Sequence, residues 1–290
     1  SLSRREPTGE FHRRRSNSAD RASIKFGRRL PNSAGAASSP ASKTKIIVEA
    51  DSLALGNVEK IDKTFFDWLE TIGTGILWHK EVWEKSLTSW LAEKHWGGYH
   101  HEQINGVPDI RHASGYEVYQ YQIDPQVARS VRAYRKRFVQ QLKARKIDVM
   151  LDIVTNHMAM DAPDLIKVPG LGIVYDEQGY IQALKNEFPE YRGRSDKELL
   201  ALLSPSPEHT VFPYYRHPAR PDKIIRKARN QPCEGFYESA AQINYLSESA
   251  RRYMIKNALR NALEYSLYGG VRLDLAFAAL WVNVANSLGW

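Results

Sequence analysis

The stretch "YGGVRLDLAFAAL", residues 268–280, decides how the fold is interpreted, because it places two charges within an apolar run. Side chains alternate along a β-strand, so Arg272 and Asp274 would point to one face while Leu273 and Leu275 point to the other. A guanidinium and a carboxylate in so apolar a segment must pair with each other or face water or a ligand. The stretch alone leaves two interpretations open: a structural ion pair at a strand end, or part of a binding site.

Segments typical of strands and of helices alternate on the N-terminal side of this stretch. Short apolar, β-branched runs predict strands at 45–50, 74–79, 147–157 and 269–276. Helical spacing of apolar residues predicts helices at 60–73, at 126–146, at 247–266 with Ser247 or Ser249 as the cap, and from 279 onward. This alternation favours an α/β fold with a parallel sheet, either open and doubly wound or a (β/α)8 TIM-type barrel of which about four units are present. No glycine-rich phosphate loop follows the first strand, which weakens a nucleotide-binding interpretation.

Residues 158–240 break the alternation. They are rich in prolines, charges and aromatic residues, which predicts an irregular subdomain inserted after the third strand, with a short helix at 195–203. We therefore expect a partial barrel over residues 45–290 that carries this insertion.

The net charge of +8 resides in the first part of the chain. Residues 1–45 hold 11 Lys and Arg against 3 Asp and Glu, so residues 46–290 are neutral overall. The Ser-, Arg- and Pro-rich composition predicts a disordered basic tail over 1–44, and the neutral remainder argues against nucleic acid as a partner. No apolar segment is long enough to span a membrane, and the first residues lack the apolar centre of a signal peptide. These features, together with the single Cys233, favour a cytoplasmic location over an oxidising one and say nothing of the oligomeric state.

Polar residues cluster at the ends of the third and fourth predicted strands, where ligands bind in both architectures. Four motifs follow one another: a G-Y…I-D-P segment at 114–125, D-x-x-x-N-H at 152–157, "QINY" at 242–245 and G-x-R-x-D at 270–274. In this order and form the motifs resemble those of the α-amylase superfamily of glycoside hydrolases. The resemblance covers roughly residues 46–280 and implies a catalytic (β/α)8 barrel that acts on α-glycosidic bonds in carbohydrates by a retaining mechanism.

The resemblance assigns roles to individual residues. It implies that Asp274 is the nucleophile, that Arg272 keeps this carboxylate ionised, and that Asp152 braces Arg272. It further implies that His157 hydrogen-bonds the sugar and that Tyr116 stacks on the sugar ring. We expect residues 80–112 and 158–240 to line the pocket, with four candidate sugar contacts: Trp96, His100, His101 and His112. The "HWGGYHH" run in the first of these segments could instead indicate a metal site, but the histidines lack helical i, i+4 spacing.

Two departures from the family pattern bear on activity and on cofactors. No cofactor is required by the resemblance, although Asn156 matches a position that helps to bind Ca²⁺ in many members. Phe277 and Ala278 stand where a Lys-His pair commonly follows the nucleophile motif, which argues against Ca²⁺ and against starch-type specificity. No acidic residue follows Asp274, so the general acid of the family is missing. We therefore expect a fragment of a hydrolase or transglycosidase that is inactive as it stands; the alternative is a non-catalytic protein of the same fold that acts through protein contacts.

Overall fold

A four-stranded parallel sheet organises the part of the chain that the computed structural model describes, namely residues 45–89, 103–104, 107–108, 113–203, 212–229, 236–237 and 239–276. The predicted basic tail at 1–44 and the predicted helix that starts at 279 lie outside these residues. So do Trp96, His100, His101 and His112, together with Phe277 and Ala278. No helix within the described ranges is long and apolar enough to cross a membrane.

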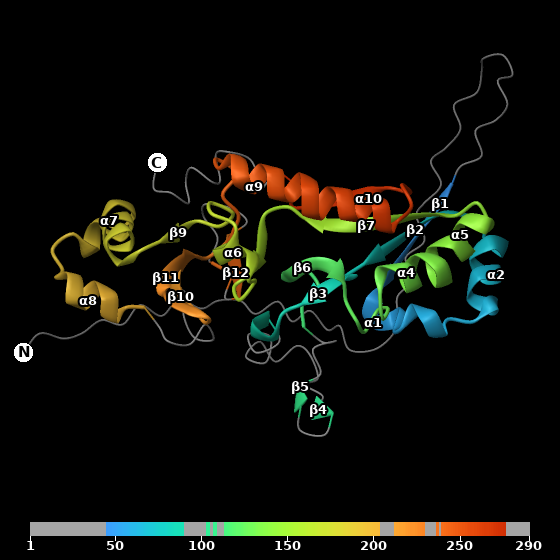
Figure 1. Ribbon diagram of the computed structural model, residues 1–290, viewed down its shortest axis with the longest axis horizontal. Helices are drawn as coiled ribbons and strands as arrows, with labels where there is room; N and C mark the ends of the chain where they lie inside the picture. Colours follow the sequence, from blue (N-terminus) through green and yellow to red (C-terminus); the bar gives the residue numbers. More distant parts are fainter. Residues whose placement is uncertain are drawn as a thin grey trace, which may run out of the picture.

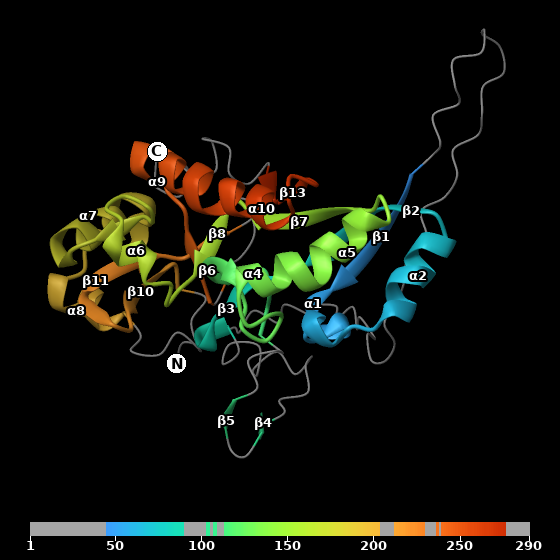
Figure 2. The ribbon, with the colours of Figure 1, turned by 45° about the vertical axis from the view of Figure 1, so that its right-hand side comes forward.

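The sheet contains the four predicted strands in the order β1-β2-β7-β13. Its strands are β1 (Ile46–Asp51), β2 (Thr74–Lys80), β7 (Asp148–Val154) and β13 (Val271–Asp274), and all three neighbouring pairs are parallel. Figure 1 shows β1, β2 and β7 in the centre of the molecule, and Figure 2 shows β13 beside β7. Since parallel strands end at the same edge of a sheet, the residues that follow β7 and β13 are brought close together. The arrangement fits part of an α/β barrel, and closure into a barrel stays a prediction.

Helices connect the strands, as a parallel sheet requires. The connection from β1 to β2 contains α1 (Ser52–Leu55), η1 (Val58–Lys60) and α2 (Lys63–Thr71), and Asp62 caps the last of these. A continuous helical stretch formed by α4 (Val131–Tyr134), η3 (Arg135–Val139) and α5 (Gln140–Ala144) leads into β7. Another, formed by α9 (Glu248–Tyr253), η6 (Met254–Leu259) and α10 (Arg260–Tyr265), leads to β13. Ser247 occupies the N-cap position of α9, but its side chain accepts no hydrogen bond there. The two stretches lie alongside β7 (Figure 2).

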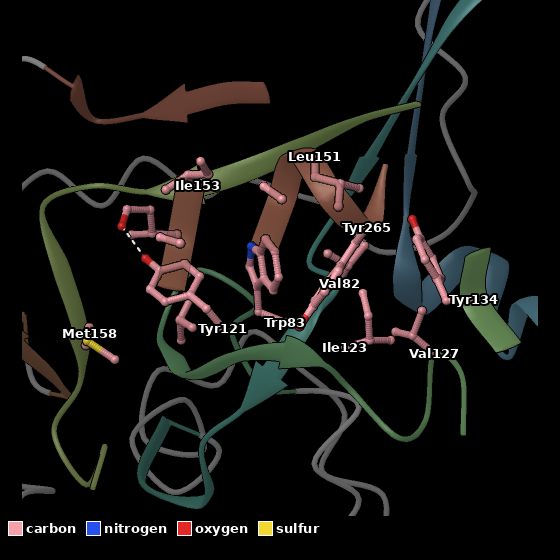
Figure 3. Close-up of a cluster of buried hydrophobic side chains, with 14 of the residues drawn as sticks. Val82, Trp83, Tyr121, Ile123, Val127, Tyr134, Leu151, Ile153, Met158 and Tyr265 are labelled. Carbon is pink, nitrogen blue, oxygen red and sulfur yellow. Dashed lines mark hydrogen bonds between the residues drawn. The ribbon is translucent and has the colours of Figure 1, made fainter. Parts of the chain in front are cut away.

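The hydrophobic core lies against the apolar face of the sheet. Leu77, Val149 and Leu151 are fully buried there, as alternation along β2 and β7 requires. Figure 3 shows Trp83 and Tyr121 beneath Leu151 and Ile153, with the Tyr121 hydroxyl donating to the Val154 carbonyl oxygen at 2.5 Å. Trp83 lies on β3 (Trp83–Lys85) and Tyr121 on β6 (Val118–Ile123), which pair antiparallel. β3 and β6 are thereby fixed against the end of β7.

The segment that follows β7 is more regular than the sequence predicts. It leaves through β8 (His157–Ala159) and returns through the antiparallel β12 (Ala240–Gln242). Between them lie a three-stranded sheet and three short helices: β9 (Val174–Tyr175), β10 (Tyr214–His217), β11 (Arg220–Arg226), α6 (Asp164–Lys167), α7 (Glu177–Glu187) and α8 (Asp196–Ala201). The predicted helix at 195–203 is confirmed as α8, with Ser195 and Glu198 forming a capping box.

The described part of the insertion contains regular elements, where the sequence predicts an irregular segment, because it buries an apolar cluster of its own. Tyr180, Leu184, Leu199, Tyr214 and Ile224 form the centre of this second cluster. Figure 1 shows the corresponding elements, α7, α8, β10 and β11, grouped at the end of the molecule away from β1. The small sheet and its helices can therefore hold a defined conformation next to the main sheet.

Candidate active site

Two strands bring the predicted charged residues together. Arg272 on β13 stands directly opposite Asp152 on β7, and its Nη1 donates to Asp152 Oδ1 at 3.3 Å. The same Nη1 also donates to Asp274 Oδ1, two residues further along β13. Arg272 and Asp152 thus make the contact that the predicted bracing requires, and one guanidinium contacts two carboxylates.

Asp274 occupies the end of its strand and is held there through its main chain. Both the backbone N–H and the hydroxyl of Thr155 donate to the Asp274 carbonyl oxygen, at 3.2 and 2.8 Å. The side chain of Asp274 remains 13% exposed, whereas that of Asp152 is only 3% exposed. Asp274 is therefore the carboxylate of the pair that a ligand can reach, and Asp152 lies beneath it.

The environment of Asp152 sets an unusual acidity for a carboxyl group. Burial raises the pKa of Asp152 to about 6, although the charge of Arg272 and a hydrogen bond from Trp78 act in the opposite direction. The neighbouring negative charge of Asp274 raises this pKa further. At neutral pH Asp152 is mainly ionised and can hold Arg272, and acidification below pH 6 removes that charge.

Trp78 on β2 completes the support of Arg272 and was missed by the sequence analysis. Its Nε1–H donates to Asp152 Oδ1 at 3.0 Å, and the Arg272 guanidinium carbon lies 5.0 Å from the centre of its ring. Trp78 alternates along β2 with the fully buried Leu77 and His79. A tryptophan on the polar face of that strand was the only sequence signal that could have identified it.

A pocket of about 300 Å³ opens beside Asp274, at the lower end of the roughly 300–1,000 Å³ range of small-molecule sites. It is lined by Ser114, Tyr116, Glu117, His157, Tyr237, Asp274 and Leu275. The structure thus brings Tyr116, His157 and Asp274 together at one pocket, and it adds Glu117 and Tyr237, which the sequence analysis did not single out. The sequence signal that could have identified Glu117 is its position directly after Tyr116 in the G-Y motif.

One orientation predicted from strand alternation is wrong. The sequence places Leu275 on the face opposite Asp274, but β13 ends at Asp274 and Leu275 has a φ of 50°. This left-handed conformation turns the chain, so that Leu275 lines the same pocket as Asp274. Leu273, which remains within the strand, is 50% exposed on the other side.

His157 enters the site as a neutral side chain. Burial lowers the pKa of His157 to about 4, and a hydrogen bond with the backbone of Tyr116 only partly opposes this. A neutral imidazole can both donate and accept a hydrogen bond, as recognition of a hydroxyl group requires. Its ring centre lies 5.1 Å from that of Tyr237.

Asn156 is engaged by protein groups in a way that does not fit a calcium ligand. Its amide oxygen accepts from Gln242 Nε2 at 3.1 Å, and its amide nitrogen donates to the Arg229 carbonyl oxygen at 3.2 Å. The described ranges also contain no group of three His, Cys, Asp or Glu side chains placed to hold a metal ion. Asn156 here connects the end of β7 to the returning segment through these two hydrogen bonds.

Two further features lie apart from the site. Asp124, the acidic residue of the G-Y…I-D-P segment, is buried in a turn where it accepts from the backbone N–H groups of Gln126 at 2.7 Å and Lys85 at 3.3 Å. A wider depression of about 730 Å³ lies over η1 and α2 and includes Phe65 and Trp68. None of the residues around Asp274 lines it, so the charges and the pocket at the ends of β7 and β13 define the candidate site.

Comparisons by sequence give no match: no family model and no curated protein resembles this chain. Comparison by structure gives many matches, among which are enzymes of the α-amylase type. An α-amylase from Lactobacillus plantarum is 16% identical over 76% of this chain and 35% of its own, with a TM-score of 0.41. The maltogenic α-amylase AmyB from Thermotoga neapolitana is 17% identical over 79% of this chain and 38% of its own, with a TM-score of 0.41.

A mutant of MutB in complex with the substrate sucrose is 14% identical over 82% of this chain and 36% of its own, with a TM-score of 0.48. The chain thus spans about a third of the length of the solved structures that it matches. At these identities and scores the matches record a resemblance, and a functional assignment has to come from the site itself.

Proposed function

We propose that this chain carries the nucleophile half of a retaining active site of the α-amylase type, for hydrolysis or transglycosylation at α-glycosidic bonds. One observation carries the proposal: Arg272 donates to the partly exposed Asp274 at the edge of a pocket that Tyr116 and His157 also line. A structural ion pair needs no such pocket. The order of the four sequence motifs supports the same assignment.

In the proposed reaction the Asp274 carboxylate attacks the anomeric carbon of the sugar. The bond from this carbon to the leaving oxygen breaks, the leaving oxygen takes the electron pair and a proton, and an ester bond joins the sugar to Asp274. Water or a sugar hydroxyl then attacks the same carbon and gives its proton to the group that protonated the leaving oxygen. The bond to Asp274 breaks, the carboxylate is released, and hydrolysis or transglycosylation results. Arg272 orients Asp274 and stabilises its negative charge between turnovers.

The remaining side chains prepare the site for this step. Asp152 and Trp78 fix the guanidinium of Arg272 from below. The ring of Tyr116 offers an apolar face to the C–H groups of a pyranose, and the neutral His157 can hydrogen-bond its hydroxyl groups. The substrate is therefore a carbohydrate, and the proposal requires no cofactor.

In the proposed scheme this chain does not provide the group that protonates the leaving oxygen. No Asp or Glu follows Asp274 in the sequence, where the family places its general acid. General acids contribute a factor of about 10²–10⁴ to rate. We therefore propose that the 290-residue chain alone is inactive on glycosides whose leaving group must be protonated.

A substrate that needs no acid tests the nucleophile directly. Fluoride leaves without protonation, so 5-fluoro-α-D-glucosyl fluoride should glycosylate Asp274 in the full chain, as measured by intact mass and peptide mapping. The Asp274→Asn variant is the matched control, since the amide keeps the shape of the side chain but is a poor nucleophile. An adduct on Asp274 supports the proposal. If the sugar binds but forms no adduct, or the adduct forms elsewhere, the nucleophile assignment is wrong; if no sugar binds, a non-catalytic role through protein contacts is favoured.

A further inference from the structure

A tyrosine from the insertion reaches the pocket that lies between the ends of the main strands. Tyr237 precedes β12, lines the pocket together with Tyr116 and Asp274, and places its ring against His157. Its backbone N–H donates to the Ala228 carbonyl oxygen at 2.8 Å. The insertion therefore contributes a side chain to the site, and a second aromatic ring joins that of Tyr116.

The neighbouring residue anchors Tyr237 to the insertion. The guanidinium carbon of Arg226 lies 4.6 Å from the ring centre of Phe236, and that of Arg229 lies 5.3 Å from it. Arg226 is fully buried and forms an ion pair with Glu187 at the end of α7. Phe236 is thus held on the side of the insertion while Tyr237 lines the pocket, which fixes the position of Tyr237 relative to the second cluster.

The charges around the pocket restrict the class of ligand. Of the described residues that line it, Glu117 and Asp274 are acidic and none is Lys or Arg. The guanidinium of Arg272, which contacts Asp274, already donates to two carboxylates. An anionic ligand would face net negative charge, whereas a neutral ring with an apolar C–H face would meet two aromatic side chains.

We propose that Tyr237 is a substrate-binding residue that, together with Tyr116, stacks on one neutral pyranose ring. Through Tyr237 the insertion sets the specificity of the site. This inference rests on the proposed function, because it takes the pocket at Asp274 to be the sugar site. It assigns neutral hexoses as the ligand class and excludes uronic acids and sugar phosphates.

Binding measurements on the full chain test this inference. Ligand-observed NMR titration with methyl α-D-glucopyranoside should give a Kd that Tyr237→Ala weakens about tenfold and Tyr237→Phe leaves within about threefold, since the phenyl ring preserves stacking. The same titration with methyl α-D-glucuronide should show binding at least about tenfold weaker in the unaltered chain. Tyr268→Ala is the matched control, because Tyr268 is 73% exposed and precedes β13 at the end opposite Asp274; it should leave the Kd unchanged.

The adduct experiment separates this inference from the proposed function. If Tyr237→Ala forms the Asp274 adduct with the same concentration dependence as the unaltered chain, Tyr237 does not bind the sugar and the inference fails while the nucleophile assignment stands. If no adduct forms in any variant but Tyr237→Ala still loses binding, the inference stands and the nucleophile assignment fails. If Tyr237→Ala and Tyr237→Phe lose sugar affinity to the same extent and also lower the Tm to the same extent, the role of Tyr237 is structural only. This result would also overturn the inference.

Discussion

Arg272 and Asp152 stand opposite each other on neighbouring parallel strands, with Nη1 and Oδ1 3.3 Å apart. The same guanidinium reaches Asp274, which lies two residues further along its own strand on the same face. Strand register thus brings Asp152 and Arg272, which are 120 residues apart in the chain, into one charged cluster with Asp274.

The hydrogen bond from Trp78 to Asp152 should matter for reactivity more than for folding. Trp78→Phe keeps an aromatic ring beneath Arg272 but removes the N–H that donates to Asp152. A hydrogen bond to a charged group contributes about 1.5–3 kcal/mol, so we expect the rate of Asp274 adduct formation to fall about tenfold or more. The lost donor also stabilised ionised Asp152, so the pH below which the rate declines should move upward. An unchanged rate and pH profile would show that Trp78 does not position the cluster.

The raised pKa of Asp152 predicts a pH-dependent difference in stability. With a pKa of about 6 in the folded chain, against an ordinary 3.8, the folded state binds more protons between those values. The contribution of Asp152 to stability is therefore fully present below pH 4 and is lost as the pH rises through 6. The Tm of Asp152→Asn, relative to that of the unaltered chain, should rise from pH 4.5 to pH 7. A flat difference would mean that Asp152 titrates at its ordinary pKa.

Close approach of the segment before β13 to β7 predicts a specific packing defect at Gly269. A Cβ at this position would clash with the carbonyl oxygen of Val149 on β7. Gly269→Ala should lower stability by about 1–3 kcal/mol, as measured by thermal unfolding, because the backbone of one strand has to move. Gly193→Ala is the control: no atom lies within 4 Å of its Cβ, so its Tm should not fall. Equal Tm values for the two variants would contradict this account of the contact between β7 and β13.

The missing general acid predicts a sharp dependence on the leaving group. Methyl α-D-glucopyranoside and sucrose should not be hydrolysed by the 290-residue chain, whereas the activated fluoride should react. Among the described residues that line the pocket, Glu117 is the second acidic one, so Glu117→Gln is the informative variant. Turnover of an unactivated glycoside that disappears in both Glu117→Gln and Asp274→Asn would show that Glu117 supplies the proton.

The sequence predicts the main sheet and the charged cluster because both depend on local signals. Apolar β-branched runs mark the four strands, and polar residues at the ends of two of them mark the site, so Asp152, Arg272 and Asp274 could be placed in advance. The insertion could not be predicted in the same way. Strand β11 is exposed over its first half and buried over its second. The conformation of the insertion depends on the packing of this strand against α7 and α8.

The residues missed at the site share this dependence on tertiary contacts. Tyr237 belongs to a segment without strand or helix periodicity. The contacts of Phe236 with Arg226 and Arg229, together with the hydrogen bond of Tyr237 to Ala228 and its ring contact with His157, place it at the pocket. Leu275 was assigned to the wrong face because a left-handed residue ended the strand earlier than its apolar sequence indicates. Such turns follow from packing around the strand end rather than from the residue itself.

The central claim is that the Arg272–Asp274 pair serves chemistry rather than folding, and Arg272→Lys tests it most directly. An ammonium keeps the charge but lacks the planar guanidinium that lies against the ring of Trp78 while its Nη1 donates to Asp152 and Asp274. The decisive measurement is the rate of Asp274 adduct formation from 5-fluoro-α-D-glucosyl fluoride, taken together with the Tm on the same samples of the unaltered chain and of Arg272→Lys. The account predicts a rate reduced about a hundredfold at a Tm within a few degrees of the unaltered chain. A Tm lowered by many degrees with an unchanged rate per folded molecule would show a structural ion pair and would contradict the account.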